Sequence, residues 1–129
     1  MSITMTLGYS AAGVGTAVSQ SVTKTGTGSL DIREAIADET TDGEVAYVVD
    51  VSQLVAVFIL SDQALTIETN DGAAPQETIS LAAGVPLMWH DGLADAGCPF
   101  SDDITALFVT NASGATANLS IMTLVDVTV

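Results

Sequence analysis

Few side chains in this sequence can transfer protons, attack a substrate or hold a metal. His90 is the single histidine and Cys98 the single cysteine among 129 residues. One histidine cannot build a multi-histidine zinc site, and no Gly-x-Ser-x-Gly elbow supplies a nucleophile for it. Asp95, Asp102 and Asp103 lie close to Cys98 in sequence, and negative neighbours disfavour a reactive thiolate. We therefore expect no enzyme, no catalytic residue and no cofactor, and we interpret Cys98 as a buried structural residue.

Carboxylates are plentiful, but their surroundings do not indicate a hydrolase. A glycosidase places two of them across a groove that aromatic side chains line. Aromatic residues make up only 5% of this chain, so such a groove is hard to build. The glycine pairs 13/15 and 26/28 lack the lysine of a phosphate-binding loop, and turns or bulges explain them better.

One loop could gather hard oxygen ligands for calcium. Residues 90–103 include Asp91, Asp95, Asp102 and Asp103 among glycines. Their spacing does not match an EF-hand, in which acids alternate before a glycine. Turn formation and solvation explain the same residues, so the sequence leaves an ion at this loop open.

The charge balance limits the possible partners. Sixteen acidic residues face only Lys24 and Arg33, which gives a formal net charge of −14 and an isoelectric point near 4.1. Such a surface repels phosphate backbones and anionic lipid, so we expect neither nucleic-acid nor membrane binding. It permits a cation-rich protein partner, and it would equally keep an apolar β protein dispersed in water.

Composition and length predict one domain over residues 1–129. Apolar residues make up 48% and mean hydropathy is +0.49, enough for a core, while small and β-branched residues favour strands. The N-terminus has no basic segment followed by a long apolar one, and the longest apolar run, residues 54–60, is too short to span a bilayer. We expect a soluble protein made in the cytoplasm.

Period-two alternation between turn signals predicts about eight to ten short strands in one antiparallel β-sandwich or jelly-roll-like barrel. Residues 54–60 read as a strand buried on both faces. Residues 105–111 and 116–129 read as a hairpin, and residues 30–38 fit either a strand or a short helix. The other expected strands cover residues 2–9, 17–25, 44–51, 64–70, 77–81 and 86–89.

The chain from Ser52 onward resembles small virion proteins of tailed bacteriophages. The likeness lies in residues 60–70, LSDQALTIETN, and in residues 107–121, LFVTNASGATANLSI. It implies a capsid decoration, or cement, protein on the capsid exterior. Such a protein clamps neighbouring major capsid subunits, often as a homotrimer. A tail or head-completion protein, and a carbohydrate- or Ca²⁺-dependent binding module, remain alternatives.

Four residues are candidates for the contact with the capsid. Trp89 and Phe100 could supply apolar contacts, although packing in the core explains Phe100 better and Trp89 about as well. Lys24 and Arg33 could act as individual ion-pair anchors, and solvated side chains are the alternative reading.

Overall fold

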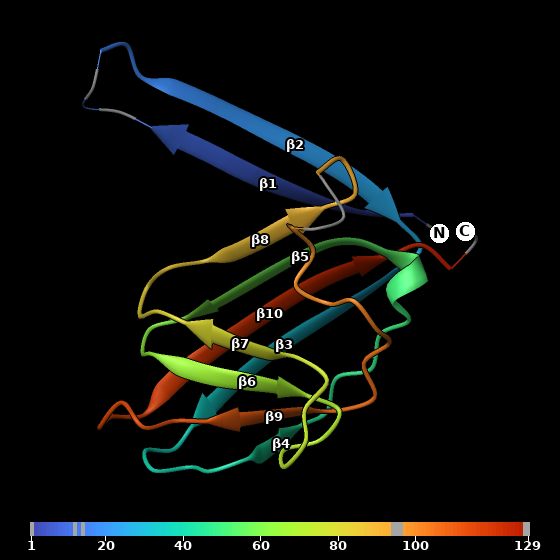
Figure 1. Ribbon diagram of the computed structural model, residues 1–129. Helices are drawn as coiled ribbons and strands as arrows, with labels where there is room; N and C mark the ends of the chain where they lie inside the picture. Colours follow the sequence, from blue (N-terminus) through green and yellow to red (C-terminus); the bar gives the residue numbers. More distant parts are fainter. Residues whose placement is uncertain (1, 12, 14, 94–96, 128–129) are drawn as a thin grey trace.

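The computed structural model describes residues 2–11, 13, 15–93 and 97–127, and these are almost entirely strands and loops (Figure 1). A 3₁₀ turn, η1, covers Val51–Gln53. The strands are β1 (Ile3–Ala11), β2 (Val18–Gly26), β3 (Gly28–Ile36), β4 (Gly43–Val45), β5 (Leu54–Ser61), β6 (Leu65–Thr69), β7 (Thr78–Leu81), β8 (Leu87–His90), β9 (Leu107–Thr110) and β10 (Ala117–Val125).

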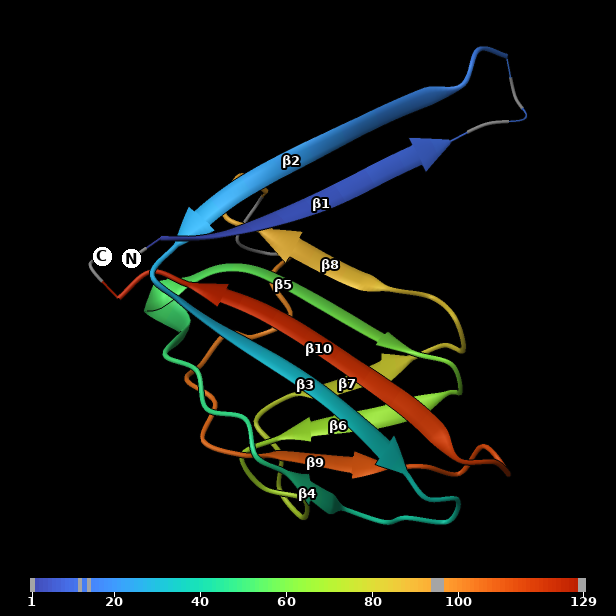
Figure 2. The same ribbon diagram turned by 180° about the vertical axis from the view of Figure 1, so that it is seen from behind.

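Two four-stranded antiparallel sheets pack face to face. Their strand orders are β3-β10-β5-β8 and β4-β9-β6-β7, and Figures 1 and 2 show the two layers. Strand β5 pairs with both β10 and β8 and is buried almost throughout, as its continuous apolar sequence predicts. The predicted all-β antiparallel sandwich is confirmed.

The core lies between these sheets because alternate side chains of each strand point inward. Strand β10 buries Ala117, Leu119 and Ile121, and β6 buries Leu65 and Ile67. These side chains belong to one apolar cluster to which both sheets contribute. Period-two patterning is therefore the local cause of the fold, and the core between the two sheets supports it.

The predicted hairpin of residues 105–111 and 116–129 is wrong. Strand β9 pairs with β4 and β6 in one sheet, whereas β10 pairs with β3 and β5 in the other. The connection therefore crosses from sheet to sheet. Asn111 makes this possible: it is fully buried, and its amide donates to the backbone carbonyls of Ile36, Ala37 and Ala115 at 2.8–3.2 Å.

Two other segments, residues 30–38 and 44–51, differ in part from the strands that the sequence predicts. Of residues 30–38, which fitted either a strand or a short helix, residues 30–36 form most of β3, and residues 37 and 38 follow its end. The strand expected at residues 44–51 is shorter, because β4 ends at Val45 and only an isolated bridge, Val49 to Ile104, follows. The Asp50 side chain then accepts the backbone N–H of Ser52 and starts η1.

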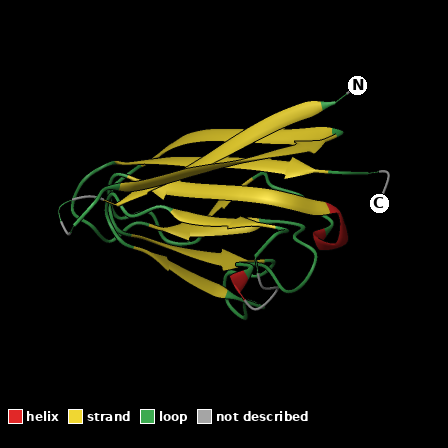
Figure 3. Cartoon of the chain, turned by 90° about the horizontal axis from the view of Figure 1, so that it is seen from above, coloured by secondary structure: helices red, strands yellow, loops and turns green. Residues whose placement is uncertain are grey.

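Strands β1 and β2 form a separate hairpin, which we call the arm (residues 3–26). Their antiparallel register runs from Ile3 opposite Gly26 to Ala11 opposite Val18. Figures 1 and 2 show the arm leaving the sandwich near the chain termini and diverging from it. Figure 3 shows it crossing the strands of the layer beneath.

Candidate interaction surface: the arm and the sheet beneath it

A second, smaller apolar cluster holds the base of the arm against the sandwich. Leu7 is buried on the outer face of the β3-β10-β5-β8 sheet, where it meets Val55, Ala56 and Leu124. Partly buried neighbours complete the cluster: Ile3, Met5, Phe58 and Met88. The predicted alternation of residues 2–9 is confirmed for Ile3, Met5 and Leu7, which all belong to this cluster. The side chain of Tyr9 lies outside the described residues.

The joint between arm and body depends on a close backbone approach. A Cβ at Gly26 would collide with the carbonyl oxygen of Val125, so only glycine fits there without movement. Just beyond it, the N–H of Thr27 donates to that same carbonyl at 2.9 Å, and the Thr27 hydroxyl accepts the N–H of Val127 at 2.9 Å. These contacts fix where the arm departs.

A single ion pair also links the arm to the body. The Lys24 ammonium lies 2.7 Å from an Asp91 carboxylate oxygen, and the two side chains are 26% and 50% exposed. Solvent screening at this exposure leaves such a pair about 0–1 kcal/mol of stabilisation. The apolar cluster, not the ion pair, therefore carries most of the attachment.

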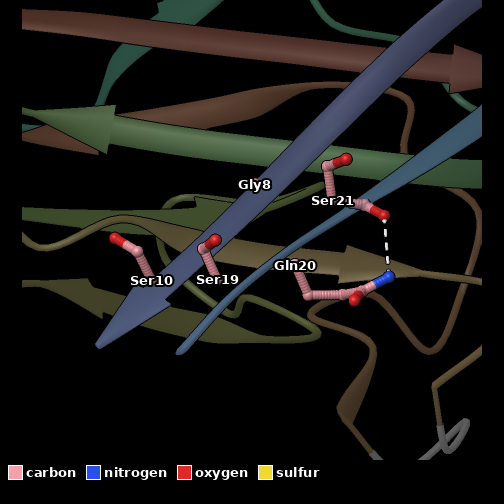
Figure 4. A pocket seen from close by; sticks show the side chains of 5 residues that line it. All are labelled: Gly8, Ser10, Ser19, Gln20 and Ser21. Carbon is pink, nitrogen blue, oxygen red and sulfur yellow. Dashed lines mark hydrogen bonds between the residues drawn. The ribbon is translucent and has the colours of Figure 1, made fainter. Parts of the chain in front are cut away.

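The outer half of the arm makes little contact with the body. Val18 is 67% exposed, and Ser10, Ser19 and Gln20 are exposed as well. Figure 4 shows an open hollow there, lined by short polar groups and containing one hydrogen bond, from the Gln20 amide to the Ser21 carbonyl at 3.3 Å. No titratable group lines this hollow, so it offers shape and hydrogen bonds but no acid–base chemistry.

One face of the arm carries hydroxyl groups almost exclusively. Facing pairs along it are Thr4–Thr25, Thr6–Thr23, Gly8–Ser21 and Ser10–Ser19. The Thr6 and Thr23 hydroxyls lie 3.1 Å apart and share a hydrogen bond. Cross-strand hydroxyl pairs stabilise an exposed two-stranded ribbon without adding charge.

An apolar groove runs beneath β1, between the arm and the outer face of the sheet. Two adjoining hollows of about 190 and 230 Å³ share Met5, Thr6 and Met122. Phe58 and Met88 lie at one end of the groove, and Met122 is 37% exposed on its floor. Methionine side chains adapt to irregular partners, and uncharged apolar surface of this kind is typical of interface centres.

Charge is strongly segregated along the chain and over the fold. Residues 1–30 contain no aspartate or glutamate, so the acidic residues all follow the arm. Both cations lie on the arm side, where Lys24 pairs with Asp91 and the Arg33 Nε donates to Asp31 at 2.7 Å. The arm is therefore free of acid, whereas the sheet beneath it also carries Glu34 in β3 and, at strand ends, Asp62 and Asp126.

The opposite sheet carries uncompensated acid. Strands β4, β9, β6 and β7 contain Glu44 and Glu68 and no lysine or arginine, and Asp42 and Asp71 lie at strand ends. Loss of hydration raises the pKa of Glu68, and the neighbouring Asp42 and Asp71 carboxylates raise it further. Repulsion among these groups marks this as the acidic face.

Of the four predicted contact residues, the two aromatic ones are buried in the sandwich core. Trp89 is 6% exposed and Phe100 is 2% exposed, and Phe100 packs against Tyr47 with ring centroids 5.9 Å apart. Both reach a hollow of about 430 Å³ that they line with Val51, Cys98 and Ser101. In the single chain they act as core residues, and neither lines the arm groove.

The two predicted cationic contacts, Lys24 and Arg33, do lie on the arm side. Each is already engaged in the ion pair described above, rather than solvated alone. The Arg33 pair is about 60% exposed, so it adds little to folding stability. The structure does not bring these cations together with Trp89 or Phe100 into one site.

The loop of residues 90–103, where the sequence left calcium binding open, gathers no metal site in the part that is described. Asp95 lies outside the described residues; Asp91 meets Lys24, and Asp103 accepts the backbone N–H of Val51 at 2.9 Å. Within the described residues no group of three or more His, Cys, Asp or Glu side chains could hold a metal ion.

His90 and Cys98 each make a contact with the backbone nearby. His90 is buried, and its Nδ1 accepts the N–H of Gly92 at 3.0 Å. Cys98 is only half-buried, less than expected, and its thiol lies 3.2 Å from the Phe100 carbonyl oxygen.

Sequence reasoning missed the groove residues Met5, Phe58, Met88 and Met122. Their strands were predicted, but which sheet face the arm would cover was not. One feature of the sequence could have indicated that residues 1–30 form a distinct surface: they contain no acidic residue, in a chain that is otherwise strongly acidic.

No family model, curated protein or solved structure matches this chain. Nor does any helix among the described residues have the length and apolar character needed to cross a membrane. The class of protein that the fold and surface define is thus an antiparallel β-sandwich with a neutral projecting arm.

Proposed function

We propose that this chain is a bacteriophage virion structural protein that binds the outside of the capsid and stabilises contacts between major capsid subunits. The observation that carries the proposal is an arm without acidic residues set over an apolar groove, on the side of the molecule opposite the acidic face. Charged groups are costly to bury in an interface, so the arm and its groove are the better docking surface.

The acidic face has a role in the same proposal. Facing away from the capsid, Glu44, Glu68 and their neighbours would keep the decorated particle dispersed through like-charge repulsion. The arm and groove would meet capsid subunits, with Met122 and Phe58 near the centre of the contact. The chain would act there as a homo-oligomer, and the major capsid protein would be its partner.

The test is co-sedimentation of the purified chain with empty capsids assembled from a major capsid protein encoded near its gene, followed by electron cryomicroscopy. We expect saturable binding at a fixed ratio and regular density on the exterior. Met122→Glu should weaken binding by at least about tenfold, because it places an unpaired charge in the groove.

Val85→Glu is the matched control, since Val85 is exposed at 55% in the β7–β8 connection, away from the groove. It should bind like the unmodified chain. Absence of binding to both unexpanded and expanded capsids would overturn the proposal. Binding to tails instead would favour a tail component.

A further inference from the structure

The outer edge of β2 is an unpaired strand edge, except at its base, where Gly26 is buried against Val125. Nine residues, Val18–Gly26, pair with β1 on one side only. The strand contains no proline and no bulge, and its one charged residue is Lys24. In Figures 1 and 2 this edge faces away from the sandwich. Such edges readily pair with another chain, and natural proteins usually block them with charge, proline or a bulge.

We infer that the β2 edge pairs with the β2 edge of a second copy of this chain, antiparallel and across a two-fold axis. The two arms would then form one four-stranded sheet, in the order β1-β2-β2-β1. This contact between copies goes beyond the capsid proposal and does not depend on it.

The distribution of charge favours a second copy of this chain as the partner of the β2 edge. A cationic partner strand would be drawn to the acidic face rather than to a nearly neutral arm. Two copies carrying −14 each repel one another when their bodies meet, but the arms contain no acid. Pairing at the arms joins the copies where repulsion is least, and the projecting arms keep the acidic bodies apart.

The side chains of β2 are compatible with self-pairing. A two-fold axis at Val22 sets this residue opposite itself, Ser21 opposite Thr23, and Gln20 opposite Lys24 of the second copy. Hydroxyl groups then face hydroxyl groups, and the Gln20 carbonyl can accept from the lysine. No like charges are opposed, which is the requirement for a stable cross-strand pair.

The contact is isologous, so it closes at two copies. The inferred assembly is therefore a dimer, whereas the resemblance implies a homotrimer. The first measurement is light scattering on the purified full chain after size exclusion. We expect a mass of twice the 13.1 kDa chain. One copy, or three, would overturn the inference.

A pair of variants locates the contact. Ser21→Glu/Thr23→Glu places glutamates directly opposite one another in the dimer and should weaken association by at least about tenfold. Thr4→Glu/Thr6→Glu adds the same charge to the same exposed face of β1, and it also breaks the Thr6–Thr23 hydrogen bond. This control should remain dimeric. Equal weakening of both would contradict pairing through β2.

Hydrogen exchange on the unmodified chain tests the edge without any substitution. Protection of β2 amides should rise with protein concentration, while the amides of β4, at the edge of the sandwich, stay unchanged. Protection independent of concentration would overturn the inference. Capsid binding is measured separately, so a monomer that binds capsids and a dimer that does not are distinguishable outcomes.

Discussion

The arm and the sandwich are both built from antiparallel strands, but they differ in how much apolar surface they bury. The sandwich buries a row of apolar side chains from each of its sheets, and the core is continuous. In the arm, Leu7 is the only buried apolar side chain among those described. A two-stranded ribbon is marginal in water, so the arm depends on its seat against the sheet.

The two regions also differ in charge. The sandwich holds all the acid and the arm holds none. The acidic region is thus the one with the large core, and the arm, which we propose as the contact surface, is held by the smaller cluster. This difference between the two regions leads to the following expectations.

The largest effect should come from shortening a side chain in the sandwich core. Ile67 is fully buried in β6, so Ile67→Ala should lower the free energy of unfolding by about 2–5 kcal/mol. Leu7→Ala, in the arm cluster, should cost less globally but should expose the arm to protease. Denaturant unfolding and limited proteolysis measure the two effects. If Leu7→Ala destabilised the chain as much as Ile67→Ala, arm and sandwich would form one cooperative unit.

An intermediate effect is expected at the joint. Gly26→Ala forces a Cβ against the Val125 carbonyl oxygen, so the arm base must shift, at a cost of about 1–3 kcal/mol. Gly8→Ala is the matched control in the facing strand, because no atom lies close to a Cβ there. Thermal unfolding with proteolysis of the arm compares them. Equal melting temperatures for the two variants would show that the joint is not the constraint.

The sequence predicted the fold because period-two alternation decides which side of each strand is buried. It predicted β1, β2 and β5 within one or two residues, and it gave the apolar face of β1 correctly. It failed at the β9–β10 connection, where Asn-Ala-Ser-Gly is a typical hairpin turn. There the buried amide of Asn111 satisfies carbonyls from a distant segment, and this tertiary contact overrides local turn chemistry.

The surface was less accessible to sequence reasoning than the fold. Trp89 and Phe100 were predicted as possible apolar contacts with a partner. A large side chain can equally fill a core that is otherwise built from small residues, and both residues lie in the core. The groove residues, in contrast, come from β1, β5, β8 and β10, which meet only through long-range packing. No local pattern places Met5 above Met122.

The smallest expected effect concerns the acidic face and depends on pH. The pKa of Glu68 is raised in the folded chain by lost hydration and by Asp42 and Asp71. The folded state therefore binds this proton more tightly than the unfolded state does. Ionised Glu68 opposes folding at neutral pH, and the penalty is relieved as pH falls through the raised pKa.

Glu68→Gln should accordingly raise the melting temperature at pH 7, and the gain should vanish at about pH 3.5, below the ordinary glutamate pKa. Glu44→Gln, on the same sheet face, controls for the general benefit of removing one acid and should give a smaller gain. A gain at Glu68 that persisted in acid would show that packing, not repulsion, is the cause. In that case like-charge repulsion would not destabilise the acidic face, and the acidic face would not differ from the arm in this respect.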